Sequence, residues 1–148
     1  MKKFLSVILL VVFMFSLSAC NADKIQIEDY EWKMKTVMSN DINDAQNEDE
    51  LVGAVGEADE SYPNSKIVDV TLRAENGEII ITDATDNKTY TGTYKMQNKT
   101  PDGIIYDVVI DGISGYATVA MTEYYDGSQV PTLPINLGEY SLYFIPNN

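Results

Sequence analysis

The chain has no histidine and only one cysteine among its 148 residues. The lack of histidine excludes Ser-His-Asp and Cys-His catalysis and zinc sites built on imidazole. One cysteine can form neither an intrachain disulfide nor a cysteine-based metal cluster. A pair of carboxylates acting as in glycosidases stays open, but no spacing singles out such a pair among the 23 acidic residues. We therefore expect a protein that is not an enzyme and that uses no cofactor.

Basic residues are also scarce. Ten lysines and arginines stand against 23 acidic residues, which gives a formal net charge of −13 at pH 7. Such a surface repels the phosphates of nucleic acids and the headgroups of anionic lipids, so we expect no nucleic-acid partner. An acidic excess ordinarily serves solubility, and attraction of a cationic partner or of metal ions is the alternative.

Long apolar runs are absent except at the N-terminus. Lys2 and Lys3 precede Phe4–Phe15 (FLSVILLVVFMF), which is apolar apart from one serine, and small residues follow. This order is typical of an export signal. The run is shorter than the roughly 20 apolar residues that a membrane-spanning helix needs. We expect residues 1–19 to be a cleaved signal peptide.

The single cysteine closes this segment. Leu17-Ser18-Ala19-Cys20 resembles the lipobox of bacterial lipoproteins, in which an aliphatic and two small residues precede an invariant cysteine. The resemblance implies cleavage before Cys20 and diacylglycerol on its thiol, and two acyl chains are enough for stable anchoring. It also implies a protein anchored to the cell membrane at its extracytoplasmic face, with residues 20–28 as a lipidated tether. The alternative is ordinary signal cleavage that leaves an unmodified cysteine.

From Lys66 onward, short β-prone runs alternate with turn signals at intervals of roughly ten residues. Residues 67–74 alternate between apolar and polar, as in a strand with one wet face. Asn76-Gly77 is a strong signal for a two-residue hairpin turn, and we expect a longer bend over residues 111–115. The pattern predicts an all-β fold, an antiparallel up-and-down meander of eight or nine strands that closes as a barrel, with a β-sandwich as the alternative.

The first strand is expected over residues 30–38, with Trp32, Met34 and Met38 on one face. A tryptophan near the start of the meander and an aromatic-rich last strand resemble the small lipocalin-like (calycin) barrels of bacterial lipoproteins. This resemblance implies one barrel domain over residues 29–148 and a role for Trp32 in closing its bottom. The segments YEWKM, YPNSK and TYTGTYK are also similar to those of Gram-positive lipoproteins that carry no assigned activity.

Tyrosines are the most informative of the remaining features. Tyrosine combines apolar area with a hydroxyl, so a cavity lined by it would accept a partly apolar small molecule. Our candidates for such a pocket are Trp32, Tyr90, Tyr94 and Tyr106, because we expect Gly92 to leave space beside the two tyrosines of its own strand. The alternative is that these rings simply fill the core.

The acidic loop over residues 41–50 raises the question of calcium. An EF-hand loop that began at Asp41 would need an oxygen donor at its fifth position, glycine at its sixth and glutamate at its twelfth. The residues there are Ala45, Gln46 and Val52, so the match fails. We expect a solvated loop, with weak calcium binding as the alternative.

These observations predict a lipid-anchored, monomeric, lipocalin-like barrel that binds a small, partly apolar ligand without catalysis. The alternative is a barrel or sandwich without a ligand, which acts as a structural or protein-interaction module at the cell surface.

Overall fold

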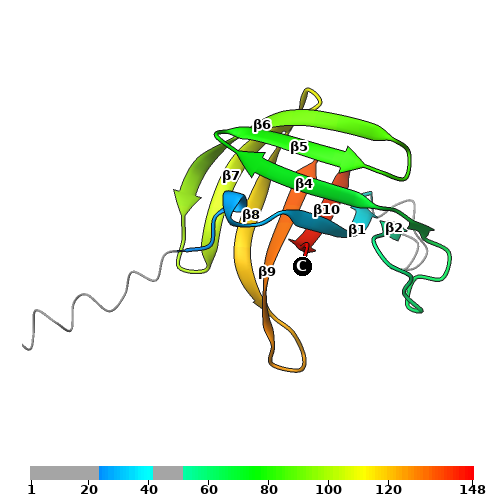
Figure 1. Ribbon diagram of the computed structural model, residues 1–148. Coiled ribbons are helices and arrows are strands. Elements are labelled where there is room, and N and C mark those ends of the chain that lie inside the picture. Colours follow the sequence, from blue (N-terminus) through cyan, green and yellow to red (C-terminus); the bar gives the residue numbers. More distant parts are fainter. Residues whose placement is uncertain (1–23, 42–51) are drawn as a thin grey trace, which may run out of the picture.

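The computed structural model describes residues 24–41 and 52–148, which form one β-sheet rolled into a barrel (Figure 1). The one short helix described is the 3-10 turn η1 (Ile27–Asp29). The strands are β1 (Trp32–Ser39), β2 (Val52–Val55), β3 (Lys66–Ile67), β4 (Val70–Glu75), β5 (Glu78–Asp83), β6 (Lys88–Lys99), β7 (Gly103–Ile110), β8 (Ile113–Glu123), β9 (Gln129–Leu137) and β10 (Tyr140–Pro146).

Eight of these strands close the barrel. β4 to β10 pair successively as antiparallel neighbours, and β1 pairs with β4 on one side and with β10 on the other. The predicted all-β up-and-down meander is therefore confirmed, and the sandwich alternative is wrong because one sheet closes on itself. Closure pairs the edges that an open sheet would leave exposed.

The turns between strands follow the local sequence. Asn76 and Gly77 both adopt positive φ, 52° and 85°, as the two-residue hairpin turn requires. Asp111 and Gly112 do the same at 50° and 80°. The expected bend over residues 111–115 is therefore wrong, because two residues are enough for this turn and β8 already begins at Ile113.

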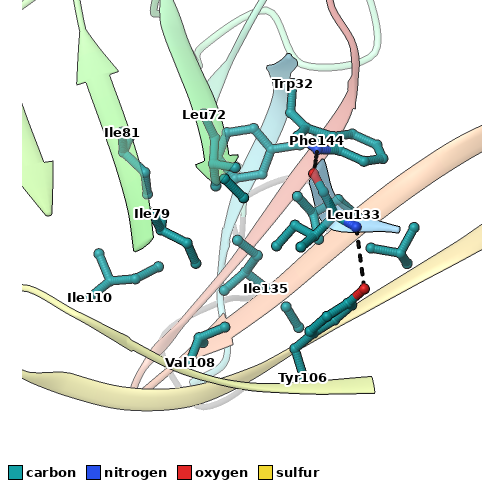
Figure 2. Packing of buried hydrophobic residues seen from close by; sticks show 14 of the residues in the cluster. Trp32, Leu72, Ile79, Ile81, Tyr106, Val108, Ile110, Leu133, Ile135 and Phe144 are labelled. Carbon is teal, nitrogen blue, oxygen red and sulfur yellow. Dashed lines mark hydrogen bonds between the residues drawn. The ribbon is translucent and has the colours of Figure 1, made fainter. Parts of the chain in front are cut away.

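The interior is filled by aliphatic and aromatic side chains (Figure 2). The even-numbered residues from Val68 to Ala74 point inward, as their alternation predicted, and each is at most 8% exposed. Ile79 and Ile81 extend this row on β5, and Ile135 faces it from β9. Burial of these side chains supplies the main stabilisation, since the described residues contain only two salt bridges, both at the surface.

Strand β1 departs from simple alternation. The pairing of β1 with β10 shifts by one residue between Met34 and Thr36, which is a β-bulge. Trp32 and Met34 are buried as expected, but the bulge turns Val37 toward the core in place of Met38. The prediction that Met38 shares the face of Trp32 is therefore wrong beyond the bulge.

The bulge also marks the place where β1 changes partners. Trp32 and Lys33 pair with β4, whereas Thr36 and Val37 pair with β2. β2 in turn pairs in parallel with β3, which directly precedes β4 in the chain. β2 is thus inserted as a wedge between β1 and the start of the β3–β4 segment, at the right of Figure 1.

A glycine stands at the apex of this wedge. Gly56 follows β2, and its backbone N–H donates to the carbonyl of Lys35 at 2.9 Å. A Cβ atom at Gly56 would lie 1.9 Å from the carbonyl oxygen of Met34, so no side chain fits there.

Within the described part of the chain, no helix has the length and apolarity to cross a membrane.

We expect Gly56→Ala to lower the free energy of unfolding by about 1–3 kcal/mol, because the added methyl group must push β1 and β2 apart. Gly53→Ala, within the neighbouring strand β2, is the matched control, since a Cβ atom there meets nothing within 4 Å. Urea unfolding followed by the fluorescence of Trp32, the only tryptophan, measures both. Equal stability of the two variants would show that the apex is not tightly packed.

Candidate ligand site at the open end of the barrel

The two ends of the barrel are built differently. We call the end at which the N-terminal segment enters the closed end, and the end at which β1 finishes the open end. The closed end carries the turns that follow β4, β6 and β8. The open end carries the long connection over residues 40–69, which contains β2 and β3, and the short turns that follow β5, β7 and β9.

η1 seals the closed end. Ile27 is fully buried, and both of its backbone polar groups are bonded to the barrel. The indole Nε1 of Trp32 donates to the carbonyl of Ile27 at 2.8 Å, and the N–H of Ile27 donates to the hydroxyl of Tyr106 at 3.3 Å (Figure 2, dashed lines). Residues 27 and 28, which we expected in the tether, therefore belong to the packed domain.

Tyr94 completes this seal. Its ring packs edge-on against Tyr106, with 5.7 Å between centroids, and its hydroxyl donates to the carboxylate of Glu28. Burial, together with the hydrogen bond to Glu28, raises the pKa of Tyr94 to about 12. Burial also raises the pKa of Tyr106. Both phenols thus stay protonated across the physiological range and act as structural hydrogen-bonding groups.

The predicted pocket residues therefore separate into two places. Trp32, Tyr94 and Tyr106 lie together at the closed end, where hydrogen bonds already use their polar atoms. Tyr90 lies four residues toward the open end from Tyr94, roughly 13 Å along the strand. The expected space beside Gly92 is filled, because a Cβ atom there would lie 2.2 Å from the carbonyl oxygen of Val109.

At the open end, four inward-packed side chains are only partly buried: Val37, Ala54, Tyr90 and Leu142. We call these four residues the mouth layer. They come from β1, β2, β6 and β10. In the described part of the chain, the hydroxyl of Tyr90 makes no hydrogen bond and so remains available to a partner molecule.

The wedge formed by β2 shapes this layer. The circumference of a barrel grows with the number of strands, and β2 adds a strand at the open end alone. Ala54, whose side chain is small, points inward, whereas Val52 and Val55 are buried on the outer face of β2. The open end thus contains an additional strand, and four of its inward side chains stay partly accessible.

Three residues of the mouth layer were missed by sequence reasoning. The inward orientation of Val37 depends on the bulge, and that of Ala54 depends on the insertion of β2, neither of which alternation can indicate. Leu142 lies in the predicted last strand, and its alternation with Phe144 was an available signal.

A polar depression of about 430 Å³ lies at the closed end. The carboxylates of Glu28 and Glu31 accept hydrogen bonds from Tyr94 and Asn147, and the carboxylate of Asp29 accepts one from the N–H of Gln26 in its own turn. Since these acids already hold the N-terminal segment in place, we assign this depression to the seal. It is lined by Glu28, Asp29, Tyr30, Glu31, Arg73, Ala74 and Glu75.

Cys20, the signal segment and the acidic loop, apart from Asp41, lie outside the described residues. The calcium alternative for that loop therefore stays a prediction. Among residues 24–41 and 52–148, no group of three or more acidic side chains is arranged to hold a metal ion.

Compared with known proteins, the chain matches no family model, no curated protein and no solved structure. Its class is therefore defined by its own geometry, a closed eight-stranded antiparallel barrel with up-and-down topology, consistent with a lipocalin-like barrel.

We expect the free energy of unfolding to fall as the pH rises from about 10 to about 12. Over this range an unfolded Tyr94 loses its proton near 10, whereas the folded protein retains it until about 12. Tyr94→Phe should make this fall shallower. The matched control is Tyr125→Phe, at a fully exposed position, which should keep the steeper fall. Urea unfolding at several pH values measures how steeply the free energy of unfolding falls. Identical slopes for wild type and Tyr94→Phe would contradict the assignment of Tyr94 to the seal.

Proposed function

We propose that this protein is a lipid-anchored, extracytoplasmic barrel of lipocalin type that binds a small, partly apolar ligand at its mouth layer, without catalysis. One observation carries the proposal. Six apolar side chains that pack against the core stay partly accessible, and four of them, from β1, β2, β6 and β10, lie at the open end, while the other two, Ile25 and Tyr94, lie at the seal.

The chemistry of the mouth layer favours a ligand with one polar group. Val37, Ala54 and Leu142 offer only apolar contact, and Tyr90 adds a hydroxyl that can donate or accept one hydrogen bond. Sites of this kind hold a ligand by apolar contact and orient it with a few polar groups. The net charge of −13 disfavours an anionic ligand. We therefore infer a neutral molecule, such as an alcohol or an ester, with an apolar body.

The tether would orient the barrel relative to the membrane. Ile27 is fixed in the closed end, and seven residue-to-residue steps along the chain lead from it back to Cys20, on which we propose the lipid. Their extended length is at most about 25 Å. The closed end would thus stay near the membrane, and the open end would be turned toward the surroundings of the cell. Exchange of the ligand would take place on that outer side.

A protein-interaction module is the second candidate, and the outer surface gives it some support. Tyr116 and Tyr140 are more than half exposed on β8 and β10, and Ile113 is 52% exposed. Large apolar groups at such exposure are common in surfaces that contact other proteins.

The lipid anchor is tested by Cys20→Ser. Wild-type protein should incorporate radiolabelled palmitate in bacterial cells and sediment with the membranes. The variant should lose the label and leave the membrane fraction, because the thioether that carries diacylglycerol cannot form. Leu17→Ile is a control that keeps an aliphatic residue in the lipobox. A wild-type product without label would overturn the anchor.

The mouth layer is tested by a melting-temperature screen with medium-chain alcohols, monoacylglycerols and neutral aromatic alcohols. A ligand of the folded state raises the melting temperature by mass action. Ala54→Leu should abolish this rise, because the larger side chain fills the mouth, while Tyr125→Ala at the closed end should preserve it. A panel that shifts nothing would remove the ligand proposal and leave the interaction module.

A further inference from the structure

The outer face of β2 lines a concave site that is separate from the mouth layer. A pocket of about 370 Å³ lies between this face and the loop over residues 56–65. The volume falls within the range of small-molecule sites, roughly 300–1,000 Å³. Its lining residues are Val55, Ala58, Asp59, Glu60, Tyr62, Pro63, Ser65 and Ile67.

The apolar part of the pocket comes from both strands and from the loop. Val55 is 2% exposed and forms the floor, whereas Ile67 on β3 is 56% exposed. Tyr62 and Pro63 contribute an aromatic ring and an aliphatic ring. A large aliphatic side chain that is exposed at the edge of a concave site gives an apolar ligand a surface to cover.

The loop is held in shape without any ligand. The carbonyl of Asp59 accepts from the N–H of Tyr62 at 3.0 Å, and the carbonyl of Tyr62 accepts from the N–H of Ser65 at 3.1 Å. The hydroxyl of Ser65 donates to the carbonyl of Val52 at 2.8 Å, which fixes the end of the loop to β2. A preformed pocket spares a ligand the cost of ordering the loop.

The charges around the pocket favour a cation. Asp59 and Glu60 supply two carboxylates, and hydrogen bonds from Ser61 lower the pKa of Asp59, which keeps it ionised.

The lysines on either side are already neutralised. Lys33 is paired with Glu57 at 2.8 Å, and Lys66 is paired with Asp86 at 3.0 Å. Lys35 is close enough to contribute to the lowered pKa of Asp59, but as its smallest cause. A cation would thus find two carboxylates and one aromatic ring, while an anion would meet repulsion.

We propose that this pocket binds a small organic cation, an amine with an apolar body, independently of the ligand at the mouth layer. The apolar body covers Ile67 above the floor formed by Val55, and the ammonium group lies between the carboxylates and the ring of Tyr62. Cation–π attraction to that ring adds to the charge interaction.

The test uses three probes that share one aromatic body, namely phenethylamine, phenylethanol and phenylpropanoate. The mature protein purified from the expressing cells is titrated with each probe, and amide chemical shifts report where the probe binds. We expect phenethylamine to shift residues 55–67 and to bind at least about fivefold more tightly than phenylethanol. Phenylpropanoate should shift nothing in this region. Equal binding of the amine and the alcohol, or no shift over residues 55–67, would overturn the proposal.

Two variants and their controls distinguish binding in this pocket from binding at the mouth layer. Tyr62→Ala and Glu60→Gln should each weaken binding of phenethylamine at least about threefold, while Tyr125→Ala and Glu123→Gln at the closed end should leave it unchanged. Ala54→Leu, which fills the mouth layer, should also leave it unchanged. If Ala54→Leu abolished binding, the amine would occupy the mouth and the separate site would be wrong. If Ala54→Leu abolished ligand binding at the mouth layer while phenethylamine still bound, this proposal would stand.

Discussion

The partner change along β1 is the constraint on which the architecture of the open end depends. A strand has two edges, and one edge of β1 pairs with β10 along its whole length. Its other edge is divided between two partners, because β4 pairs with the part that contains Trp32 and β2 pairs with the part that contains Val37. Gly56 makes the division possible, since only a residue without a Cβ atom fits so close to the carbonyl of Met34. The additional strand at the open end and the pocket outside β2 both follow from this one division.

The opposite end is constrained by hydrogen bonds to a buried backbone. Ile27 brings an N–H and a carbonyl into an apolar interior, where unpaired polar groups are costly. Tyr106 and Trp32 satisfy these two groups, and Glu28 bonds to Tyr94 beside them. The aromatic residues that looked like ligand contacts in the sequence are thus needed by the chain itself. The four partly buried side chains of the mouth layer lie away from this seal, at the open end.

The sequence predicted the repetitive part of the fold well, because local rules govern it. Alternation fixed the inward face of β4, and Asn76-Gly77 fixed its hairpin. The bulge after Met34 could not be read from the sequence, since one extra residue in a strand leaves no compositional trace. The burial of Ile27 was equally hidden, because it depends on partners 5 and 79 residues away. Of the predicted pocket residues, Tyr90 alone lies outside the seal, and its role as a ligand contact stays a prediction.

Because the two proposed sites lie on opposite faces of the same short strand, they share its stability. Ala54 faces the mouth layer and Val55 faces the outer pocket, so both sites exist only while β2 stays inserted. β2 is held by a few ladder bonds to β1, by a two-residue parallel pairing with β3 and by Ser65. The wedge is therefore the one element of the fold on which both proposed sites depend.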